Sequence, residues 1–489
     1  MKALLVLSLA LVVTLCTWAT LRADSAEEVF DHAVQAEKLG NLDEAVQLYD
    51  MAAQLDPGNS AVYNNRGIVF ARQRKYDKAI EDFDQALRLN PENPGTYVNR
   101  GMAHQEMGDP DRAFADYSKA LDLEAGHAQA LCNRAVIWEK RGSISRAVAD
   151  LNEVLKTDEL NVKALVFRGR LHLAEGSWDK ALKDFTTAVR QDPANLDAWR
   201  GSGDANFLGG RFDKAVQDYT RALTCPNRDP QTLVNRCGGL IQTGDFEGAI
   251  RDCEEAVELD PASPDGFSNL GNALMSAGRD QEAVGAFGRA IDLAPAKSEN
   301  YYNRGIAFKR LGDSDRALAD FNRALEMSPR DPHVLNNRGM VLWAFGRKEA
   351  AVEDFQLAAD LDQRNVAALK NLGSAYLSQG LVDDAIRVLG KAQRLSPKDS
   401  DILLAFGDSW MEKKKFDKAL TSYKKALDNE TSPEKKCRIL VRTGLALERS
   451  GNVQKALQSY SGALGATADS SVREGLTRKI EELKAQRKR

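Results

Sequence analysis

The chain has 489 residues, of which 43% are hydrophobic and 28% charged, and this composition excludes a largely disordered protein. Its formal net charge of -4 disfavours a dedicated nucleic-acid binder. The charge is uneven: residues 411–489 hold 19 Lys and Arg against 10 Asp and Glu, which leaves -13 for the remainder and predicts an acidic body with a basic end.

The first 23 residues form a separate element. Lys2 precedes an apolar run over residues 3–19, and polar residues begin at Arg22. A basic residue before a long apolar run is typical of an export signal, with cleavage here after Ala23 or Ala19. Counted over residues 3–21, the run is also nearly long enough to span a bilayer, so an uncleaved membrane anchor is the alternative. Both interpretations predict an exported protein, whether periplasmic, otherwise extracytoplasmic or secreted.

The next 440 or so residues repeat with a fixed period, as an alanine series shows. Twelve alanines lie 34 residues apart without a slip, and Ala456 continues the series after a three-residue insertion near residues 431–436. The twelve are Ala45, Ala79, Ala113, Ala147, Ala181, Ala215, Ala249, Ala283, Ala317, Ala351, Ala385 and Ala419. The spacing predicts repeats 1–12 over residues 26–433 and repeat 13 over residues 437–468.

Other positions align when this alanine is numbered position 20. Position 8 is glycine in ten repeats, position 27 is alanine in twelve, and position 24 is aromatic in ten. Position 15 is glycine in eleven repeats and position 32 is proline in seven. Glycine can end a helix in the left-handed conformation, and proline cannot continue one. The pattern predicts two antiparallel helices in each repeat, with a turn near position 15.

These residues, at this period, resemble the tetratricopeptide repeat (TPR) family. The resemblance covers about residues 26–470. It implies an all-α fold, a right-handed superhelical solenoid of 13 helix-turn-helix repeats. Repeat 4 departs most from the pattern, with Ala135, Leu151, Val154 and Glu159 at positions 8, 24, 27 and 32.

Residues 469–489 are predicted to form a basic capping helix. Their apolar residues fall on one stripe, which suits a helix that covers the last apolar surface of a solenoid: Val472, Leu476, Ile480 and Leu483. The basic end has two interpretations, a solvated helix face or a surface that docks on an acidic partner. Its charged residues include Lys413, Lys414, Lys415, Lys435, Lys436, Arg487, Lys488 and Arg489.

A charge pair recurs inside the repeat. Seven repeats have arginine at position 7 and aspartate at position 23, which the hairpin brings to one height. The pairs are Arg66 and Asp82, Arg100 and Asp116, Arg134 and Asp150, Arg168 and Asp184, Arg236 and Asp252, Arg304 and Asp320, and Arg338 and Asp354. We interpret them as structural, partly buried ion pairs. The alternative is a row of arginines that grips an acidic ligand.

Asparagine recurs at position 6, which in TPR proteins faces the concave groove. We name these eight residues the asparagine ladder: Asn65, Asn99, Asn133, Asn235, Asn269, Asn303, Asn337 and Asn371. They are similar to the asparagine ladder of the O-linked N-acetylglucosamine transferase superhelix. An amide can donate to a peptide carbonyl and accept from a peptide N–H, so the ladder predicts a groove that binds extended protein segments. The alternative is a neutral surface residue amplified with the repeat.

Repeat 7 has cysteine at positions 8 and 24, Cys237 and Cys253. The antiparallel hairpin places these positions at one height, and an exported protein would meet an oxidising compartment, so a disulfide is possible there. The alternative is volume compensation, in which a larger residue replaces glycine and a smaller one replaces the aromatic ring.

No pattern predicts catalysis, a metal site or a cofactor. The five histidines lack metal-ligand spacing, and the sequence has no phosphate loop or nucleophile elbow. The chaperone-type carboxylate clamp of some TPR proteins is disfavoured, because Ser374 follows Lys370 at position 9 and Ala405 occupies the next position 6.

The sequence therefore predicts an exported, non-enzymatic scaffold whose groove binds other proteins or peptides, with no nucleic-acid partner. Membrane association is expected only through an uncleaved N-terminal segment. Two alternatives remain: an envelope-tethered assembly subunit that uses its outer surface and basic end, and an accessory that delivers substrates to a larger machine.

Overall fold

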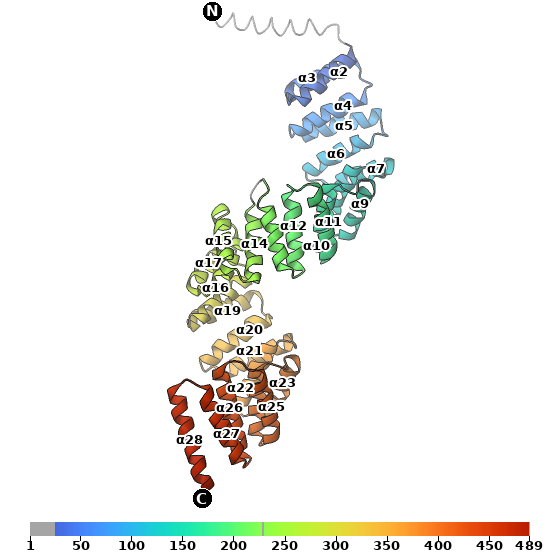
Figure 1. Cartoon of the computed structure of the whole chain (residues 1–489). Helices are drawn as coiled ribbons and strands as arrows, with labels where there is room; N and C mark the ends of the chain where they lie inside the picture. Colours follow the sequence, from blue (N-terminus) through green and yellow to red (C-terminus); the bar gives the residue numbers. More distant parts are fainter. Residues whose placement is uncertain (1–24, 227–228, 489) are drawn as a thin grey trace, which may run out of the picture. The chain divides into compact units, whose positions relative to one another are not determined.

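The computed structural model describes residues 25–226 and 229–488, so the predicted signal or anchor lies outside the described part. Within those ranges every regular element is an α-helix, and the helices follow one another as hairpins (Figure 1). Contacts divide the chain into two units, residues 1–239 and 240–489, with the boundary inside α14 (Pro230–Thr243). The all-α repeat fold expected from the sequence is thereby confirmed.

The even-numbered helices α2–α26 are the first helices of the repeats, and the odd-numbered helices are the second. The helices before α14 are α2 (Ala26–Lys38), α3 (Leu42–Leu55), α4 (Ser60–Arg72), α5 (Tyr76–Leu89), α6 (Pro94–Glu106), α7 (Pro110–Leu123), α8 (Ala128–Lys140), α9 (Ile144–Thr157), α10 (Val162–Ala174), α11 (Trp178–Gln191), α12 (Leu196–Leu208) and α13 (Phe212–Ala222). Those after α14 are α15 (Phe246–Leu259), α16 (Pro264–Ser276), α17 (Asp280–Leu293), α18 (Ser298–Arg310), α19 (Ser314–Met327), α20 (Pro332–Ala344), α21 (Lys348–Leu361), α22 (Val366–Ser378), α23 (Val382–Leu395), α24 (Ser400–Glu412), α25 (Phe416–Asn429), α26 (Pro433–Arg449), α27 (Val453–Ala466) and α28 (Ser470–Lys488).

Close packing explains the small residues of the repeat. A Cβ atom added to Gly67 of α4 would lie 2.7 Å from the ring of Phe83 in α5, and Gly101 has the same relation to Tyr117. Glycine at position 8 therefore leaves the space that the aromatic ring at position 24 fills. The alanines at positions 20 and 27, such as Ala79 and Ala86, are buried where the two helices meet.

The turn between the two helices uses a left-handed residue at position 15. All eleven glycines there have positive φ, as in Gly40 at 81°. The two repeats without glycine keep the same turn, with Arg74 at φ 59° and Lys414 at φ 56°. The backbone conformation is thus set by the hairpin, and these two side chains adopt it against their own preference.

The end of the chain differs in one respect from the sequence expectation. Repeat 13 begins at Pro433, because the inserted residues extend α26 to 17 residues rather than forming a loop before residue 437. Helix α28 then packs on α27 and buries Leu476, Ile480 and Leu483, whereas Val472 remains 38% exposed. Asp469 caps α28 by accepting the backbone N–H of Ser471 and Val472.

The question of a membrane anchor stays with the undescribed N-terminal segment. From residue 25 onward, the described helices include none that is both long and apolar enough to cross a bilayer.

Candidate functional site

The asparagine ladder lies on the first helices, and each of its eight side chains is half-buried. Several donate an amide hydrogen to the first helix of the preceding repeat. Asn99 and Asn371 donate to an asparagine at position 5, over 3.1 and 2.9 Å. Asn235 and Asn303 donate to the side chain at position 9, over 2.9 and 3.2 Å. One bond to the neighbour orients each amide and leaves its second hydrogen available for a ligand.

Other members of the ladder are held in different ways. Asn337 donates to the Tyr302 hydroxyl over 3.1 Å and accepts from the Lys309 ammonium over 2.5 Å. Asn65 accepts from its neighbour Asn64 over 3.1 Å. Asn133 hydrogen-bonds Tyr117 of the preceding repeat. Asn269 is half-buried on α16.

Packing explains one gap in the ladder. At position 6 of repeat 6, a Cβ atom added to Gly201 would lie 2.4 Å from the ring of Phe185, so no larger side chain fits. Repeat 5 has Phe167 at this position, and the guanidinium of Arg170 stacks over its ring at 4.9 Å. The amides are therefore interrupted here by packing between neighbouring repeats.

The arginines of position 7 make bidentate contacts to position 23. Arg66 donates from Nε and Nη2 to the two carboxylate oxygens of Asp82, over 2.8 and 2.6 Å. Asp82 and Asp354 are 6% and 5% exposed, so these carboxylates depend on their arginines. The same pair of bonds joins Arg100 to Asp116, Arg134 to Asp150, Arg168 to Asp184, Arg304 to Asp320 and Arg338 to Asp354.

A third contact, which the sequence reasoning missed, joins neighbouring repeats. The remaining nitrogen, Nη1, of five arginines reaches position 25 of the repeat before, over 2.6 to 3.2 Å. The pairs are Arg66 with Asp50, Arg100 with Asp84, Arg168 with Asn152, Arg236 with Thr220, and Arg338 with Asn322. The signal was present as a polar residue at position 25. These contacts make the arginines part of the scaffold, which disfavours the alternative of a ligand-gripping row.

Repeat 6 replaces the missing arginine with a relay. Asp218 accepts from the Ser202 hydroxyl over 2.7 Å and from the Asn206 amide over 2.8 Å. Arg211 in turn donates to the Asn206 oxygen over 2.8 Å. The carboxylate is therefore still satisfied, although its cation lies one residue further away.

The two cysteines of repeat 7 are fully buried, and each is disulfide-bonded in the structure. Among the other cysteines of the described residues, Cys132, Cys225 and Cys437 are free. The predicted partnership of Cys237 with Cys253 stays a prediction for chemical mapping.

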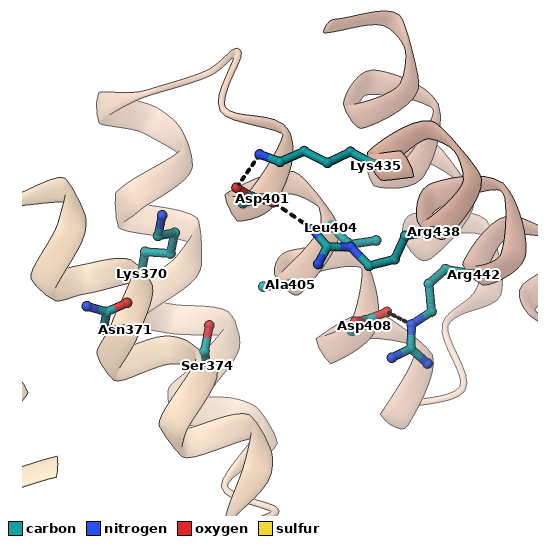
Figure 2. Close-up of a pocket in the computed structure, with 10 residues that line it drawn as sticks. All are labelled: Lys370, Asn371, Ser374, Asp401, Leu404, Ala405, Asp408, Lys435, Arg438 and Arg442. Atoms are coloured by element: carbon teal, nitrogen blue, oxygen red, sulfur yellow. Dashed lines mark hydrogen bonds and ion pairs between the residues drawn. The ribbon is translucent and has the colours of Figure 1, made fainter. Parts of the chain in front are cut away.

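Three cavities follow one another along the first helices of the second unit. The largest, about 510 Å³, lies among α22, α24 and α26 (Figure 2). A cavity of about 360 Å³ shares Asn371 and Ser374 with it and is lined mainly by apolar side chains such as Trp343 and Phe355. A third, of about 210 Å³, shares Asp408 and Arg442. The ladder residue Asn371 thus borders two of the three.

The large cavity is charged. Asp401 accepts from Lys435 over 2.8 Å and from Arg438 over 2.9 Å, and Arg442 lies 3.5 Å from Asp408. Burial opposes the shift, but the hydrogen bond and charge of Lys435 hold the pKa of Asp401 below its ordinary value. Burial raises the pKa of Asp408, against a hydrogen bond donated by Tyr423. The sequence search did not single out this set, because its arginines follow the insertion near residues 431–436.

Within residues 25–226 and 229–488, no group of histidines, cysteines and carboxylates is arranged to hold a metal ion. The site consists instead of amides, charged side chains and apolar cavities on first helices. Such a surface can hydrogen-bond a backbone and hold side chains.

Comparisons with known proteins agree with the repeat. Models of the tetratricopeptide repeat match residues 60–93, 98–161, 168–230 and 267–301, and overlapping matches follow from 302 to 471. A model described as a TPR repeat matches residues 240–278. No curated protein sequence shows a significant match.

Several solved structures are similar at low identity. The APC/C hetero-tetramer Cut9-Hcn1 is 14% identical, with 96% of this chain and 98% of that chain covered and a TM-score of 0.46. Yeast Tom70 is 20% identical, with 88% and 96% covered and a TM-score of 0.38. Pseudomonas aeruginosa pilF is 18% identical, with 45% and 98% covered and a TM-score of 0.40. The sequence models, one of which alone matches more than half of the chain, decide the assignment: this chain belongs to the tetratricopeptide repeat family.

Proposed function

We propose that this chain is an exported scaffold that binds extended protein segments along the faces of its first helices. TPR repeats support a role in protein–protein interaction in general. The observation that carries the more specific proposal is the state of the asparagine ladder. Its amides are oriented by one bond to the neighbouring repeat, as Asn371 is by Asn336, and border cavities that run from helix to helix.

The amides suit a peptide backbone better than a particular side chain. Each can offer an N–H and an oxygen at the 34-residue period of the repeat, and a backbone presents both groups at every residue except proline. Binding through the backbone reads little sequence, so specificity has to come from the cavities beside the ladder.

The test is capture of partner proteins by the full mature chain. Replacing Asn269, Asn303, Asn337 and Asn371 with alanine should weaken capture about tenfold or more, because each lost hydrogen bond contributes about 0.5–1.5 kcal/mol. The helical circular dichroism spectrum should not change.

A matched control removes two exposed amides outside the ladder, in the variant Asn90→Ala/Asn429→Ala. This control should capture partners as the unaltered chain does. Equal capture by the ladder variant and the control would contradict the proposal.

Export is a separate part of the proposal and is supported only by the composition of the first 23 residues. N-terminal sequencing of the mature protein tests it. We expect a start after Ala23 or Ala19. An intact Met1 in the membrane fraction would indicate the anchor instead, and an intact Met1 in the cytosol would contradict export.

The alternative that the basic end docks on an acidic surface loses support from its internal contacts. Lys413 forms an ion pair with Asp383, Lys435 with Asp401, and Lys479 with Glu448. These cations already have partners within the chain, so the first-helix faces carry the proposal.

A further inference from the structure

The large cavity of the second unit holds more positive than negative charge. Four cations and two aspartates line it: Lys370, Lys435, Arg438, Arg442, Asp401 and Asp408. This excess lies in a chain whose formal net charge is -4. A local surplus of cations in a concave, partly desolvated wall attracts anions more strongly than the same charges on an open surface.

The internal contacts leave two of the four cations without a full partner. Lys435 and Arg438 share Asp401. Arg442 has one ion pair, from Nε to Asp408 at 3.5 Å, and no hydrogen bond within the described residues. Lys370 has neither an ion pair nor a hydrogen-bonded side-chain partner in the described part of the chain. The unmatched charge therefore belongs to Lys370 and Arg442.

These two residues lie on opposite walls. Figure 2 shows Lys370 on α22 and Arg442 on α26, with the short side chains of Ser374 and Ala405 in the region between them. The guanidinium of Arg442 is half exposed. Burial raises the pKa of Asp408, which reduces the negative charge that this neighbour offers to Arg442. The space between the walls is open to an incoming anion.

The neighbouring cavity adds an apolar subsite. It shares Asn371 and Ser374 with the charged cavity and continues to Met340, Trp343 and Phe355. Met340 is 42% exposed, so part of this apolar surface remains in contact with water. A ligand that spans both cavities would neutralise charge in one and bury apolar surface in the other.

We propose that these two cavities bind an extended protein segment with an acidic side chain near a large apolar one. The carboxylate lies between Lys370 and Arg442, the apolar side chain enters the cavity of Trp343 and Phe355, and Asn371 hydrogen-bonds the backbone between them. This inference rests on the proposed function and names its ligand class. Asp401 and Asp408 disfavour a nucleic-acid backbone, whose phosphates they would repel.

The arrangement differs from the chaperone-type clamp, in which asparagine amides help to hold a terminal carboxylate. Ser374 and Ala405 occupy those two positions, and neither can supply the amide. What remains is an ammonium and a guanidinium on facing helices, which suits a side-chain carboxylate anywhere in a segment.

The test uses two fluorescent dodecapeptides, each acetylated and amidated so that no terminal carboxylate is present. One has two adjacent glutamates and a leucine in a serine and glycine background, and the other has glutamines in place of the glutamates. The full mature chain should bind the glutamate peptide about tenfold more tightly, because bonds to charged groups exceed neutral ones by about that factor. The preference should fall as salt rises.

The variant Lys370→Ala/Arg442→Ala should bind both peptides at the level of the glutamine peptide. A matched control, Lys424→Ala/Lys425→Ala, removes the same charge from exposed positions of α25 outside the cavity and should keep the preference. The single variant Lys370→Ala breaks no internal ion pair and guards against misfolding. It should reduce the preference several-fold.

Equal binding of the two peptides by the unaltered chain, or a preference retained in the double variant, would overturn the inference. Peptide binding that the ladder variant weakens would then leave the proposed function standing. Failure of both peptides to bind would overturn the inference, and unchanged partner capture by the ladder variant would overturn the proposed function as well.

Discussion

At the scale of single residues, the two turns without glycine show how the hairpin overrides local preference. Arg74 and Lys414 adopt positive φ, a region that costs a side-chain-bearing residue about 1 kcal/mol or more. Eleven glycines adopt the same conformation without that cost. Repeats 2 and 12 therefore carry strain that the other repeats lack.

Relieving this strain should stabilise the chain. We expect Lys414→Gly to raise the free energy of unfolding by about 1 kcal/mol, measured by urea denaturation. The neighbouring Lys413 has φ -76° and an ion pair with Asp383, so Lys413→Gly serves as the control. Equal effects of the two substitutions would show that φ at position 15 is not the cause.

The same scale marks what the sequence could and could not predict. The period of 34 fixed the helices, because glycine at 8 and an aromatic ring at 24 have one simple packing solution, as Gly67 and Phe83 show. The charged cavity was not predicted. Lys370 and Arg442 are 72 residues apart, and the insertion near residues 431–436 moves Arg442 out of the strict period. Only folding brings them to facing helices.

At the scale of the hairpin, the arginine of position 7 connects elements as well as charges. Arg338 holds Asp354 of its own hairpin and Asn322 of the one before. Repeats 8 and 11 solve the same packing problem with apolar pairs, Leu270 with Ala286 and Leu372 with Val388. Both solutions leave no buried carboxylate without a partner.

This comparison predicts a non-additive pair of substitutions. Arg338→Leu alone should cost about 3 kcal/mol, because Asp354 stays buried without its cation. Arg338→Leu with Asp354→Val copies repeat 11 and should cost much less. Hydrogen exchange should show the loss of protection around repeat 10, since a solenoid repeat contacts only its neighbours. Additive costs would contradict the assignment of a buried ion pair.

The capping helix offers a second test at this scale. Leu483 of α28 is fully buried, whereas Val472 is 38% exposed. Leu483→Ala should destabilise the last repeat by about 2–3 kcal/mol, and Val472→Ala by well under 1 kcal/mol. Hydrogen exchange in α27 measures both. Similar exchange in the two variants would mean that α28 does not cap the stack.

At the scale of the whole molecule, the chain is a series of like units that present unlike surfaces. The amides recur along the first helices, but Phe167 and Gly201 interrupt them in repeats 5 and 6. In the second unit, the charged and apolar cavities lie at its end, around α20–α26. A regular scaffold with local differences can bind a backbone generally and select side chains at a few places.

The arginine contacts also bear on how such a chain can grow. Arg66 reaches Asp82 sixteen residues after it and Asp50 sixteen residues before it, so both partners recur with the period of 34. Duplication or deletion of one whole repeat in the gene restores both contacts at the new junction, whereas any other length breaks them. The single three-residue slip precedes repeat 13, where Thr443 stands in place of the arginine and there was no such contact to lose. The history of the array is thus constrained by a hydrogen bond.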